Sequence, residues 1–366
     1  MGRKPSICIL ASQYFAWGKY GGFGSMSRKL AEGLARRGYD VSVIVPRRGE
    51  QRPVEELNGV TVTSFAPLDL REATRLLRAS RADVLHSQDP TLLTRLAQAE
   101  LPGRAHIVTC RDPRNGHDWL IEFWYATARR RLLTPFNYLT ESSFLVKEAV
   151  RGADAVYVPA HFLREKVRRM FRLPAPAGFL PNLIDVPETL PRKEGPPTMT
   201  YIARWDKRKR PWLFLDLARR FPQYRFVAVG RSEDAAYDAQ LRRLYGGIGN
   251  LEIPGFVDRF SEAARLQGIL ARSWIMVNTA AREGLPLTFL EASAYGCAIL
   301  SAVDPDGFAS RFGRHVADDD FAGALRELMA SSPPEKGKLA YEYVRRTYEH
   351  EMALDAHCQV YAQYAG

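Results

Sequence analysis

The sequence predicts an α/β protein of two domains, each a parallel β-sheet with helices on both faces. Short apolar runs rich in β-branched residues alternate with longer amphipathic segments along the chain, which is typical of strand–helix–strand units. The 366 residues are long for one hydrophobic core and comfortable for two. The alternation falters across residues 181–197, where proline recurs, so we place a domain hinge there.

Before the hinge, seven apolar segments are too short for buried helices and are predicted to be strands. They are residues 6–12, 41–45, 60–65, 83–86, 106–110, 155–158 and 178–180. Four amphipathic segments are predicted to be helices, at residues 25–37, 70–79, 91–99 and 162–171. In the first of these, Met26, Leu30 and Leu34 recur near helical spacing, and Gly38 offers a C-terminal stop.

After the hinge the alternation resumes. The predicted strands are residues 199–203, 225–229, 251–253, 275–278 and 298–302. The predicted helices are residues 212–220, 235–245, 261–271 and 286–295, followed by two helices in the tail from Pro334 onward. We therefore expect one domain over residues 1–185 and a second over residues 186–348.

One segment, residues 119–151, breaks this rhythm. An aromatic cluster is followed by the triplet Arg129-Arg130-Arg131 and then by more leucine and aromatic residues. An interfacial helix presents such a pattern to anionic lipid. A long helix packed on the sheet, with its arginines in solvent, explains the pattern as well, and we favour this second interpretation.

Composition limits the class of protein. The hydrophobic fraction of 46% and the charged fraction of 25% are those of a soluble globular chain, and no run approaches the roughly 18 apolar residues of a membrane-spanning helix. The four cysteines lie far apart and form no C-x-x-C pair, which argues against a disulfide framework or a zinc site. We expect a cytoplasmic protein.

Positive charge is concentrated in the first half of the chain. Residues 1–185 hold 28 Lys and Arg against 18 Asp and Glu, whereas residues 186–366 hold 24 against 23. Such asymmetry is typical of a domain that faces a membrane surface, a phosphorylated acceptor or a nucleic acid, the last being the partner we least expect. A solubilising surface explains the charge equally well.

Three loops at predicted strand ends are candidate ligand sites, because ligands of open parallel sheets bind beyond the carboxyl ends of the strands. The first is the glycine-rich turn of residues 18–24, which leads into a helix whose free N–H groups could meet a phosphate. It matches neither the P-loop nor the dinucleotide fingerprint, and a tight strand-to-helix turn is the alternative.

The second loop, residues 204–211, carries five cations within seven positions and leads into a predicted helix. This density at a strand end predicts a diphosphate site, with a solvated basic face as the alternative. The third loop begins at Glu283 and enters an apolar helix that contains Glu291. The two carboxylates are too far apart for an acid/base dyad, so they suit sugar and ribose hydroxyls beside phosphate-binding N–H groups. Complementing the helix dipole is the simpler role for Glu283.

In order and spacing these features resemble glycosyltransferase family 4, over nearly the whole chain. The matching stretches are the turn Gly21-Gly22-Phe23, the stretch Asn182-Leu183-Ile184-Asp185, the pair Arg204 and Lys209, the loop Gly255-Phe256-Val257, and Glu283 with Glu291 as a Glu–seven residues–Glu signature. The resemblance implies a GT-B fold, in which two Rossmann-like parallel-sheet domains face each other across a cleft. It also implies that a final helix, residues 349–366, crosses back to the first domain.

The resemblance implies a metal-independent, retaining transfer of sugar from a UDP-, GDP- or ADP-linked donor to an acceptor hydroxyl, by front-face attack and with no cofactor. Arg204 and Lys209 would neutralise the departing diphosphate. Glu283 would bind the donor sugar and Glu291 the ribose. The remaining donor contacts would come from Gly22, Phe23, Val257, Gly284, Leu285, Leu287 and Thr288. The acceptor would be a glycan, a glycolipid or a small molecule, met at the inner face of the membrane.

The sequence departs from the family pattern at the acceptor side. In the family, the strand that corresponds to the one ending at Cys110 is usually followed by a histidine. Here Arg111 stands in that place, and His117 follows six residues further on. Arg111 could bind an acceptor phosphate or carboxylate, or His117 could replace the histidine. Two alternatives follow: a catalytically altered or inactive GT-B protein that binds lipid or nucleic acid, and a GT-B sugar epimerase.

Overall fold

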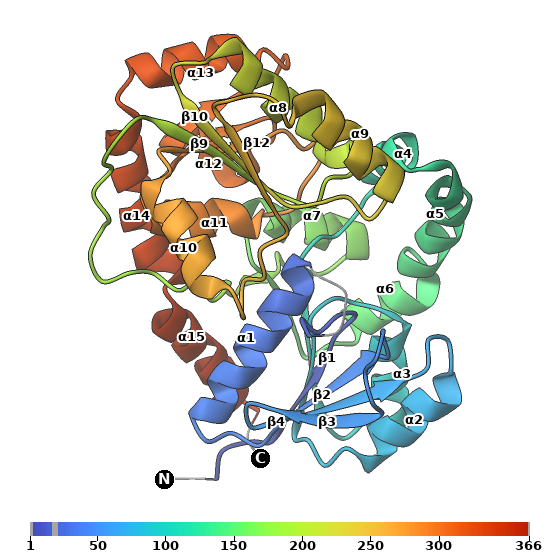
Figure 1. Ribbon diagram of the computed structural model, residues 1–366. Coiled ribbons are helices and arrows are strands. Elements are labelled where there is room, and N and C mark those ends of the chain that lie inside the picture. The colour runs from blue at the N-terminus through green and yellow to red at the C-terminus, as the bar shows by residue number, and fades with distance from the viewer. Residues whose placement is uncertain (1–2, 17–20, 365–366) are drawn as a thin grey trace. The chain divides into compact units, whose positions relative to one another are not determined.

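The chain forms two compact units in the computed structural model, which describes residues 3–16 and 21–364 apart from the side chains of Ala128 and Arg129 (Figure 1). The first unit comprises residues 1–115, 132–183 and 350–366, and the second comprises residues 116–131 and 184–349. Residues 116–131, which were expected in the first domain, group instead with the second unit. Ion pairs described below attach this segment to the second unit.

The first unit contains an eight-stranded sheet of order β3-β4-β2-β1-β5-β6-β7-β8. Its strands are β1 (Ile7–Leu10), β2 (Val41–Pro46), β3 (Val54–Leu57), β4 (Val60–Phe65), β5 (Val84–Ser87), β6 (Ala105–Thr109), β7 (Ala155–Val158) and β8 (Gly178–Phe179). All neighbours pair in parallel except β3, which runs antiparallel to β4 at one edge.

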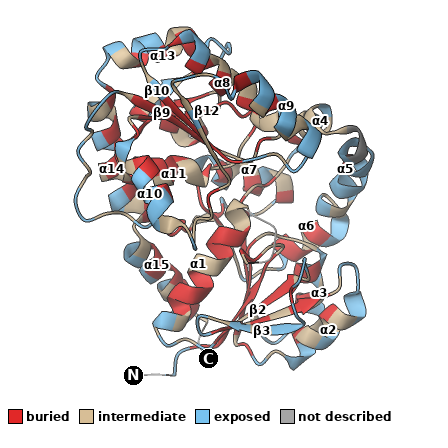
Figure 2. Ribbon diagram, in the orientation of Figure 1, coloured by how far each residue is buried: buried red, intermediate tan, exposed pale blue. Residues whose placement is uncertain are grey.

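Helices cover both faces of this sheet, and strand alternation directs each side chain to one of them. In β1, Ile7 and Ile9 pack on the side of α1 (Gly22–Arg36) and α15 (His350–Ala362), while Cys8 and Leu10 pack on the side of α2 (Leu70–Ala79) and α3 (Leu92–Glu100). Both faces are accordingly buried (Figure 2). Also in this unit are α6 (Phe144–Arg151) and α7 (His161–Phe171).

Helix α15 is part of the first unit although it ends the chain. Its Leu354 and Tyr361 join the core cluster that contains Ile7 and Ile9. At the surface, the guanidinium of Arg37, which follows α1, pairs with Glu351 at 2.6 Å and also with Asp355. The C-terminal helix therefore supplies part of the core of a domain that begins more than 300 residues earlier.

The second unit contains a six-stranded, wholly parallel sheet of order β11-β10-β9-β12-β13-β14. Its strands are β9 (Thr198–Ile202), β10 (Arg225–Val229), β11 (Leu251–Gly255), β12 (Ile275–Asn278), β13 (Ala298–Ser301) and β14 (Gly313–His315). Its helices are α4 (Gly116–Tyr125), the short η1 (Lys207–Lys209), α8 (Pro211–Arg220), α9 (Ala235–Tyr245), α10 (Ala263–Arg272), α11 (Leu287–Ala294), η2 (Pro305–Gly307), α12 (Phe308–Phe312), α13 (Phe321–Ala330) and α14 (Pro333–Tyr348).

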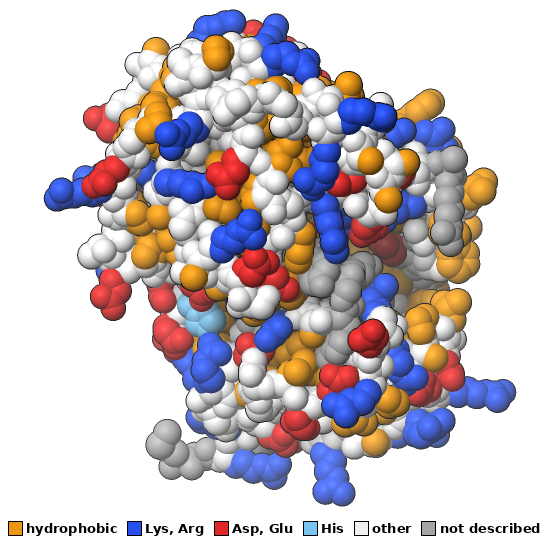
Figure 3. Space-filling view, in the orientation of Figure 1, with side chains coloured by type: hydrophobic (Ala, Val, Ile, Leu, Met, Phe, Trp, Pro, Cys, Tyr) orange, Lys and Arg blue, Asp and Glu red, His pale blue; other side chains and the backbone are white. Residues whose placement is uncertain are grey.

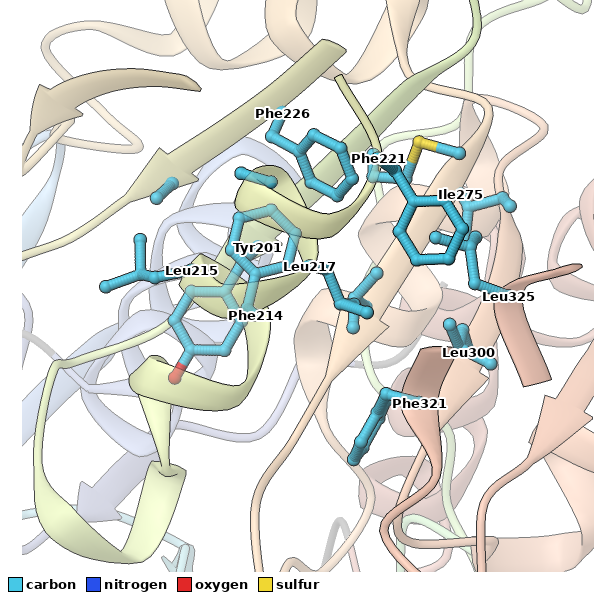
Figure 4. Packing of buried hydrophobic residues seen from close by; sticks show 14 of the residues in the cluster. Tyr201, Phe214, Leu215, Leu217, Phe221, Phe226, Ile275, Leu300, Phe321 and Leu325 are labelled. Atoms are coloured by element: carbon cyan, nitrogen blue, oxygen red, sulfur yellow. The ribbon is translucent and has the colours of Figure 1, made fainter. Parts of the chain in front are cut away.

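Aromatic and aliphatic side chains pack together on one face of the second sheet (Figure 4). The ring of Phe214 on α8 stacks on Tyr201 of β9 at 5.3 Å between centroids, and meets Phe226 of β10 edge-on at 5.6 Å. Such packing fixes α8, and with it the loop that joins β9 to α8.

The segment of residues 119–151 forms three helices rather than the one long packed helix that the sequence analysis favoured. They are α4, α5 (Ala128–Glu141) and α6. Most of the described side chains of α5 are exposed, so packing on the sheet does not explain its apolar residues. Among the described residues, no helix is both long and apolar enough to cross a membrane.

Candidate active site

The five predicted cations lie in the loop between β9 and α8, called here the cation loop (residues 204–210). Asp206 organises it: its carboxylate accepts a hydrogen bond from the backbone N–H of Lys209 at 3.0 Å and one from Nε of Arg204 at 2.9 Å. Burial raises the pKa of Asp206, but Arg204, Arg208 and Lys209 outweigh burial and hold it below its usual value. The carboxylate therefore stays ionised and keeps the loop folded.

Buried hydroxyl groups fix the backbone at the end of the cation loop. Tyr201 donates from its hydroxyl to the carbonyl of Lys209 at 3.0 Å, and Thr279, after β12, donates to the same carbonyl at 2.7 Å. Arg210 adopts φ 47°, a left-handed conformation that turns the chain into Pro211, the first residue of α8. Lys209 is thus presented from a rigid backbone.

The predicted residues Lys209 and Glu283 form an ion pair, the central contact of the site. Their side chains are 18% and 12% exposed, which leaves both within reach of a ligand. Arg208 donates to the carbonyl of Arg282 at 2.6 Å, and the N–H of Ala281 donates to the carbonyl of Arg208 at 2.9 Å. These backbone bonds hold the cation loop against the loop that carries Glu283.

Helix α4 contributes two carboxylates that sequence reasoning missed. Asp118 lies 3.0 Å from Nε of Arg282, and Glu122 lies 3.4 Å from both Arg208 and Arg282. Arg282 is almost completely buried, so its charge requires such partners. These pairs join residues far apart in the sequence, and the sequence held no local signal for them.

The predicted Glu291 lies on α11 and pairs with Arg259 at 2.9 Å. Its second oxygen, Oε2, is buried with no hydrogen-bond partner among the described residues. An unpartnered carboxylate oxygen can accept a hydrogen bond from a hydroxyl group of a ligand. Arg259 was missed, although it lies only two residues beyond the predicted Val257, which is buried.

Backbone amides complete the predicted donor contacts at the start of α11. Gly284, Leu285, Leu287 and Thr288 are partly exposed, and α11 begins at Leu287 after Pro286. No side chain caps this N-terminus. Its N–H groups can therefore meet an anion.

Gly230, at the end of β10, was also missed. Its φ is 132°, and a Cβ there would lie 1.9 Å from the carbonyl oxygen of Ala203. Only glycine lets the end of β10 approach the cation loop this closely. No motif surrounds Gly230 in the sequence, so nothing local identifies it.

The remaining predicted residues lie outside this cluster. Gly22 and Phe23 open α1 in the first unit, while residues 18–20 of the same turn lie outside the described part of the chain. His117 is exposed on α4, in the second unit. Arg111, in the first unit, is buried. The structure therefore does not bring the two acceptor-side candidates together within one unit.

Arg111 is the centre of a buried polar network at the ends of β5 and β6. Its guanidinium donates to Asn182 at 2.6 Å and also to Gln88, and its backbone N–H donates to Asp89 at 3.1 Å. Burial lowers the pKa of Arg111 to about 10 and raises the pKa of Asp89 to about 7. Nε of Arg111 has no hydrogen-bond partner among the described residues.

Two histidines lie near this network. His86 hydrogen-bonds Tyr361 of α15 at 2.7 Å and Thr109 at 2.8 Å, and His357 of α15 hydrogen-bonds the carbonyl of Pro181 at 3.2 Å. Burial lowers the pKa of His86 well below its usual value and that of His357 to about 3. Both rings are neutral and serve to attach α15 to the sheet.

Comparisons with known proteins agree with this architecture. The model of Glycosyltransferase Family 4 matches residues 20–188, and that of Glycosyl transferases group 1 matches residues 185–339. A search of curated proteins found no match.

Solved structures resemble the chain over almost its full length. A sucrose-phosphate synthase from Thermosynechococcus elongatus has a TM-score of 0.73 at 17% identity, covering 98% of this chain and 99% of that one. Anabaena HepE in complex with UDP and glucose has a TM-score of 0.68 at 13% identity, covering 98% and 100%. WaaG, a glycosyltransferase involved in lipopolysaccharide biosynthesis, has a TM-score of 0.68 at 14% identity, covering 97% and 99%.

At these identities the structural likeness shows the fold, and the two family models carry the assignment. Together they span both units and nearly the whole chain. The predicted class of two Rossmann-like parallel-sheet domains is confirmed. The chain belongs to the family 4 glycosyltransferases, enzymes of the GT-B fold.

Proposed function

We propose that this glycosyltransferase uses a nucleoside diphosphate sugar and transfers the sugar, with retention and without an essential metal ion, to an acceptor hydroxyl. The observation that carries the proposal is the pairing of Lys209 with Glu283 beside the free N-terminus of α11. A cation, a carboxylate and free amides together match a diphosphate and the hydroxyls of its sugar.

The site has the charge that a departing diphosphate requires. Arg204 and Lys209 come from one rigid loop, so they need little reorganisation when negative charge develops on the leaving phosphate. Glu283 would exchange part of its pairing with Lys209 for donor-sugar hydroxyls. The transfer would proceed by front-face attack, in which the leaving phosphate assists removal of the acceptor proton.

The nucleoside would extend toward Glu291. The buried, unpartnered Oε2 of Glu291 would accept a hydrogen bond from a ribose hydroxyl, while Arg259 holds the other oxygen. HepE was solved with UDP and with UDP-glucose, which supports a nucleotide sugar as the donor class. UDP, GDP and ADP all satisfy this proposal.

The acceptor side is proposed to involve Arg111 and His117, and the acceptor to be met in the cytoplasm at the inner face of a membrane. The buried guanidinium of Arg111 is held by Gln88 and Asn182, so it would act chiefly by ordering the loops around the acceptor. His117 is exposed and could contact an acceptor directly.

A thermal-shift panel tests the donor class. UDP, GDP and ADP are compared with the matching nucleosides and with inorganic pyrophosphate, each with and without EDTA. One diphosphate should raise the melting temperature clearly more than its nucleoside, and EDTA should leave that shift unchanged. If no diphosphate stabilises the protein, the proposed donor class is wrong.

Retention is tested separately by NMR of the product formed from the donor selected in that panel. The anomeric configuration of the product should equal that of the donor sugar, and an inverted product would contradict the proposal. Incubation with the donor alone covers the epimerase alternative, because an epimerase would convert the sugar of the nucleotide without any acceptor.

A further inference from the structure

Helices α5 and the start of α6 expose an unusual number of large apolar side chains. Of the 17 large hydrophobic residues that are exposed in the described part of the chain, seven lie between residues 132 and 145. Figure 3 shows hydrophobic side chains along the edge of the molecule where Figure 1 draws α5. Exposed apolar patches of this kind mark interaction surfaces.

The apolar side chains of α5 lie on one side of the helix. At about 100° per residue, Leu132, Phe136 and Leu139 fall within a narrow stripe, with Leu133 beside it. Their exposed fractions are 82%, 57%, 66% and 52%. The stripe continues in sequence into Phe144 and Leu145, which open α6 and are also exposed. These six residues are called here the apolar ridge.

Little of α5 is covered by the rest of the described chain. Thr134 is the one buried side chain among those described in this helix, and it lies about 200° around the axis from Leu132. The apolar stripe of α5 is therefore exposed, whereas an ordinary surface helix buries its apolar stripe. Helix α5 also contains Pro135, which is strongly unfavourable inside a helix. An exposed helix with an interior proline gains stability when a partner covers it.

The charges along α5 indicate what kind of partner that is. Among residues 126–145 the only Asp or Glu is Glu141, which ends α5 and lies 3.7 Å from Arg114, whereas the first turn of the helix carries Arg129-Arg130-Arg131. Arg130 pairs with Glu233, and Arg131 lies over the ring of Phe123, and both side chains remain exposed. Cations at one end of an apolar stripe with aromatic residues complement an anionic bilayer surface. A second copy of the chain would offer the same cations and a single carboxylate, Glu141, to set against them.

We propose that the apolar ridge inserts into the interfacial layer of an anionic lipid bilayer and holds the enzyme at the membrane. The inference deepens the proposed membrane location by naming the surface responsible. It does not depend on the donor chemistry, because none of the six ridge residues is among the proposed donor residues.

The test is co-sedimentation with vesicles of phosphatidylcholine, with and without phosphatidylglycerol. The wild-type protein should bind vesicles that contain phosphatidylglycerol. The triple variant Leu132→Ser, Phe136→Ser, Leu139→Ser should lose that binding at least tenfold, because the residues that enter the lipid are gone. The double variant Arg130→Gln, Arg131→Gln should weaken it severalfold and reduce its dependence on salt.

A matched control replaces three exposed apolar residues of the first unit that lie outside the apolar ridge. The variant Val54→Ser, Leu68→Ser, Leu70→Ser should bind vesicles like the wild type. The melting temperature and the thermal shift with the nucleoside diphosphate should be unchanged in the two serine variants, so failure of the lipid proposal and failure of the donor proposal are distinguished. The arginine variant does not serve this comparison, because Glu233 pairs with both Arg130 and Arg204. Should the ridge variant be destabilised, Phe136→Trp provides a second measurement: brominated lipid should quench its added fluorescence.

Three results would overturn the proposal. One is wild-type protein that does not bind anionic vesicles. Another is a folded ridge variant that binds as well as the wild type. The third is a wild-type dimer, seen by sedimentation velocity, that the ridge variant converts to monomer, since this would identify a second copy as the partner.

Discussion

The cation loop of the second unit and the Arg111 network of the first unit both lie at the ends of parallel strands, yet they are built differently. Lys209 and Glu283 are partly exposed and pair across two loops. Arg111 is buried, and its partners Gln88 and Asn182 are buried as well. Partly exposed pairs reopen at little cost when an anion arrives, whereas a buried network cannot lose a member without leaving polar groups unsatisfied. The first region is suited to binding and release, and the second to holding a domain together.

The largest effect is expected on catalysis at the cation loop. Lys209→Ala should lower kcat/KM for transfer by roughly 100-fold or more, because a lost cationic contact to a transition-state oxyanion is typically worth about 3 kcal/mol. Steady-state kinetics with the donor selected by thermal shift provide the measurement. The melting temperature should change little.

The neighbouring Lys207 provides the matched control, since it is exposed on the same short helix. Lys207→Ala should retain nearly all activity. Equal losses in the two variants would mean that overall charge, not the position of Lys209, sustains the reaction, and the comparison between the two regions would fail.

Replacement of Arg111 should have the opposite effect: it should lower the stability of the protein and leave binding of the nucleoside diphosphate intact. Arg111→Leu leaves the buried oxygens of Gln88 and Asn182 without donors, so the free energy of unfolding should fall by about 2–4 kcal/mol. Chemical denaturation gives the value, and the thermal shift with nucleoside diphosphate should keep its size. A variant of wild-type stability would contradict the holding role.

His357 should make the first unit sensitive to acid. Its pKa of about 3 in the folded protein lies below the ordinary value near 6.5, so below pH 6.5 the unfolded chain takes up a proton that the folded chain does not. The stabilisation is complete above pH 6.5 and is lost as the pH falls toward 3, by about 2 kcal/mol at pH 5.

The measurement compares the stability of His357→Gln with that of the wild type between pH 7 and pH 4.5. The variant should be less stable at pH 7 and should lose less stability on acidification. Parallel curves for the two proteins would show that His357 does not carry this acid sensitivity.

The smallest effect is expected from the carboxylates of α4. Glu122 lies 3.4 Å from Arg208, so it competes with an anionic ligand for that cation. Glu122→Gln should strengthen binding of the nucleoside diphosphate about two- to fivefold in isothermal titration calorimetry. Weaker binding in this variant would mean that α4 supports the donor site rather than opposing the ligand.

Local signals in the sequence predicted much of the fold. The apolar runs at residues 225–229 and 275–278 and the amphipathic run at residues 235–245 correspond to β10, β12 and α9. The strands missed were β3 and β14, which are short and carry few apolar residues, so neither alternation nor burial marks them. Helices α12 and α13 were missed as well, although Asp320, whose side chain caps α13, is a residue type that favours a helix start.

In the site, too, contiguous motifs were predicted from the sequence and contacts between distant residues were not. The cations of residues 204–210 and the signature from Glu283 to Glu291 are contiguous, and their pattern predicted a cluster that the structure brings together in part. The partners of Arg282 and Arg111 come from residues far away in the chain, including Asp118 and Asn182, and the fold alone makes them neighbours. The packing of α5 was predicted wrongly for a related reason, because an apolar stripe does not reveal whether it is buried or exposed.

The central claim is that the cation loop binds the diphosphate of the donor. Isothermal titration calorimetry of the preferred nucleoside diphosphate and of its nucleoside, against wild type and the double variant Arg204→Ala, Lys209→Ala, tests this most directly. The account predicts that the double variant loses the affinity difference between diphosphate and nucleoside while remaining folded. A folded double variant that still prefers the diphosphate to the same degree would contradict it.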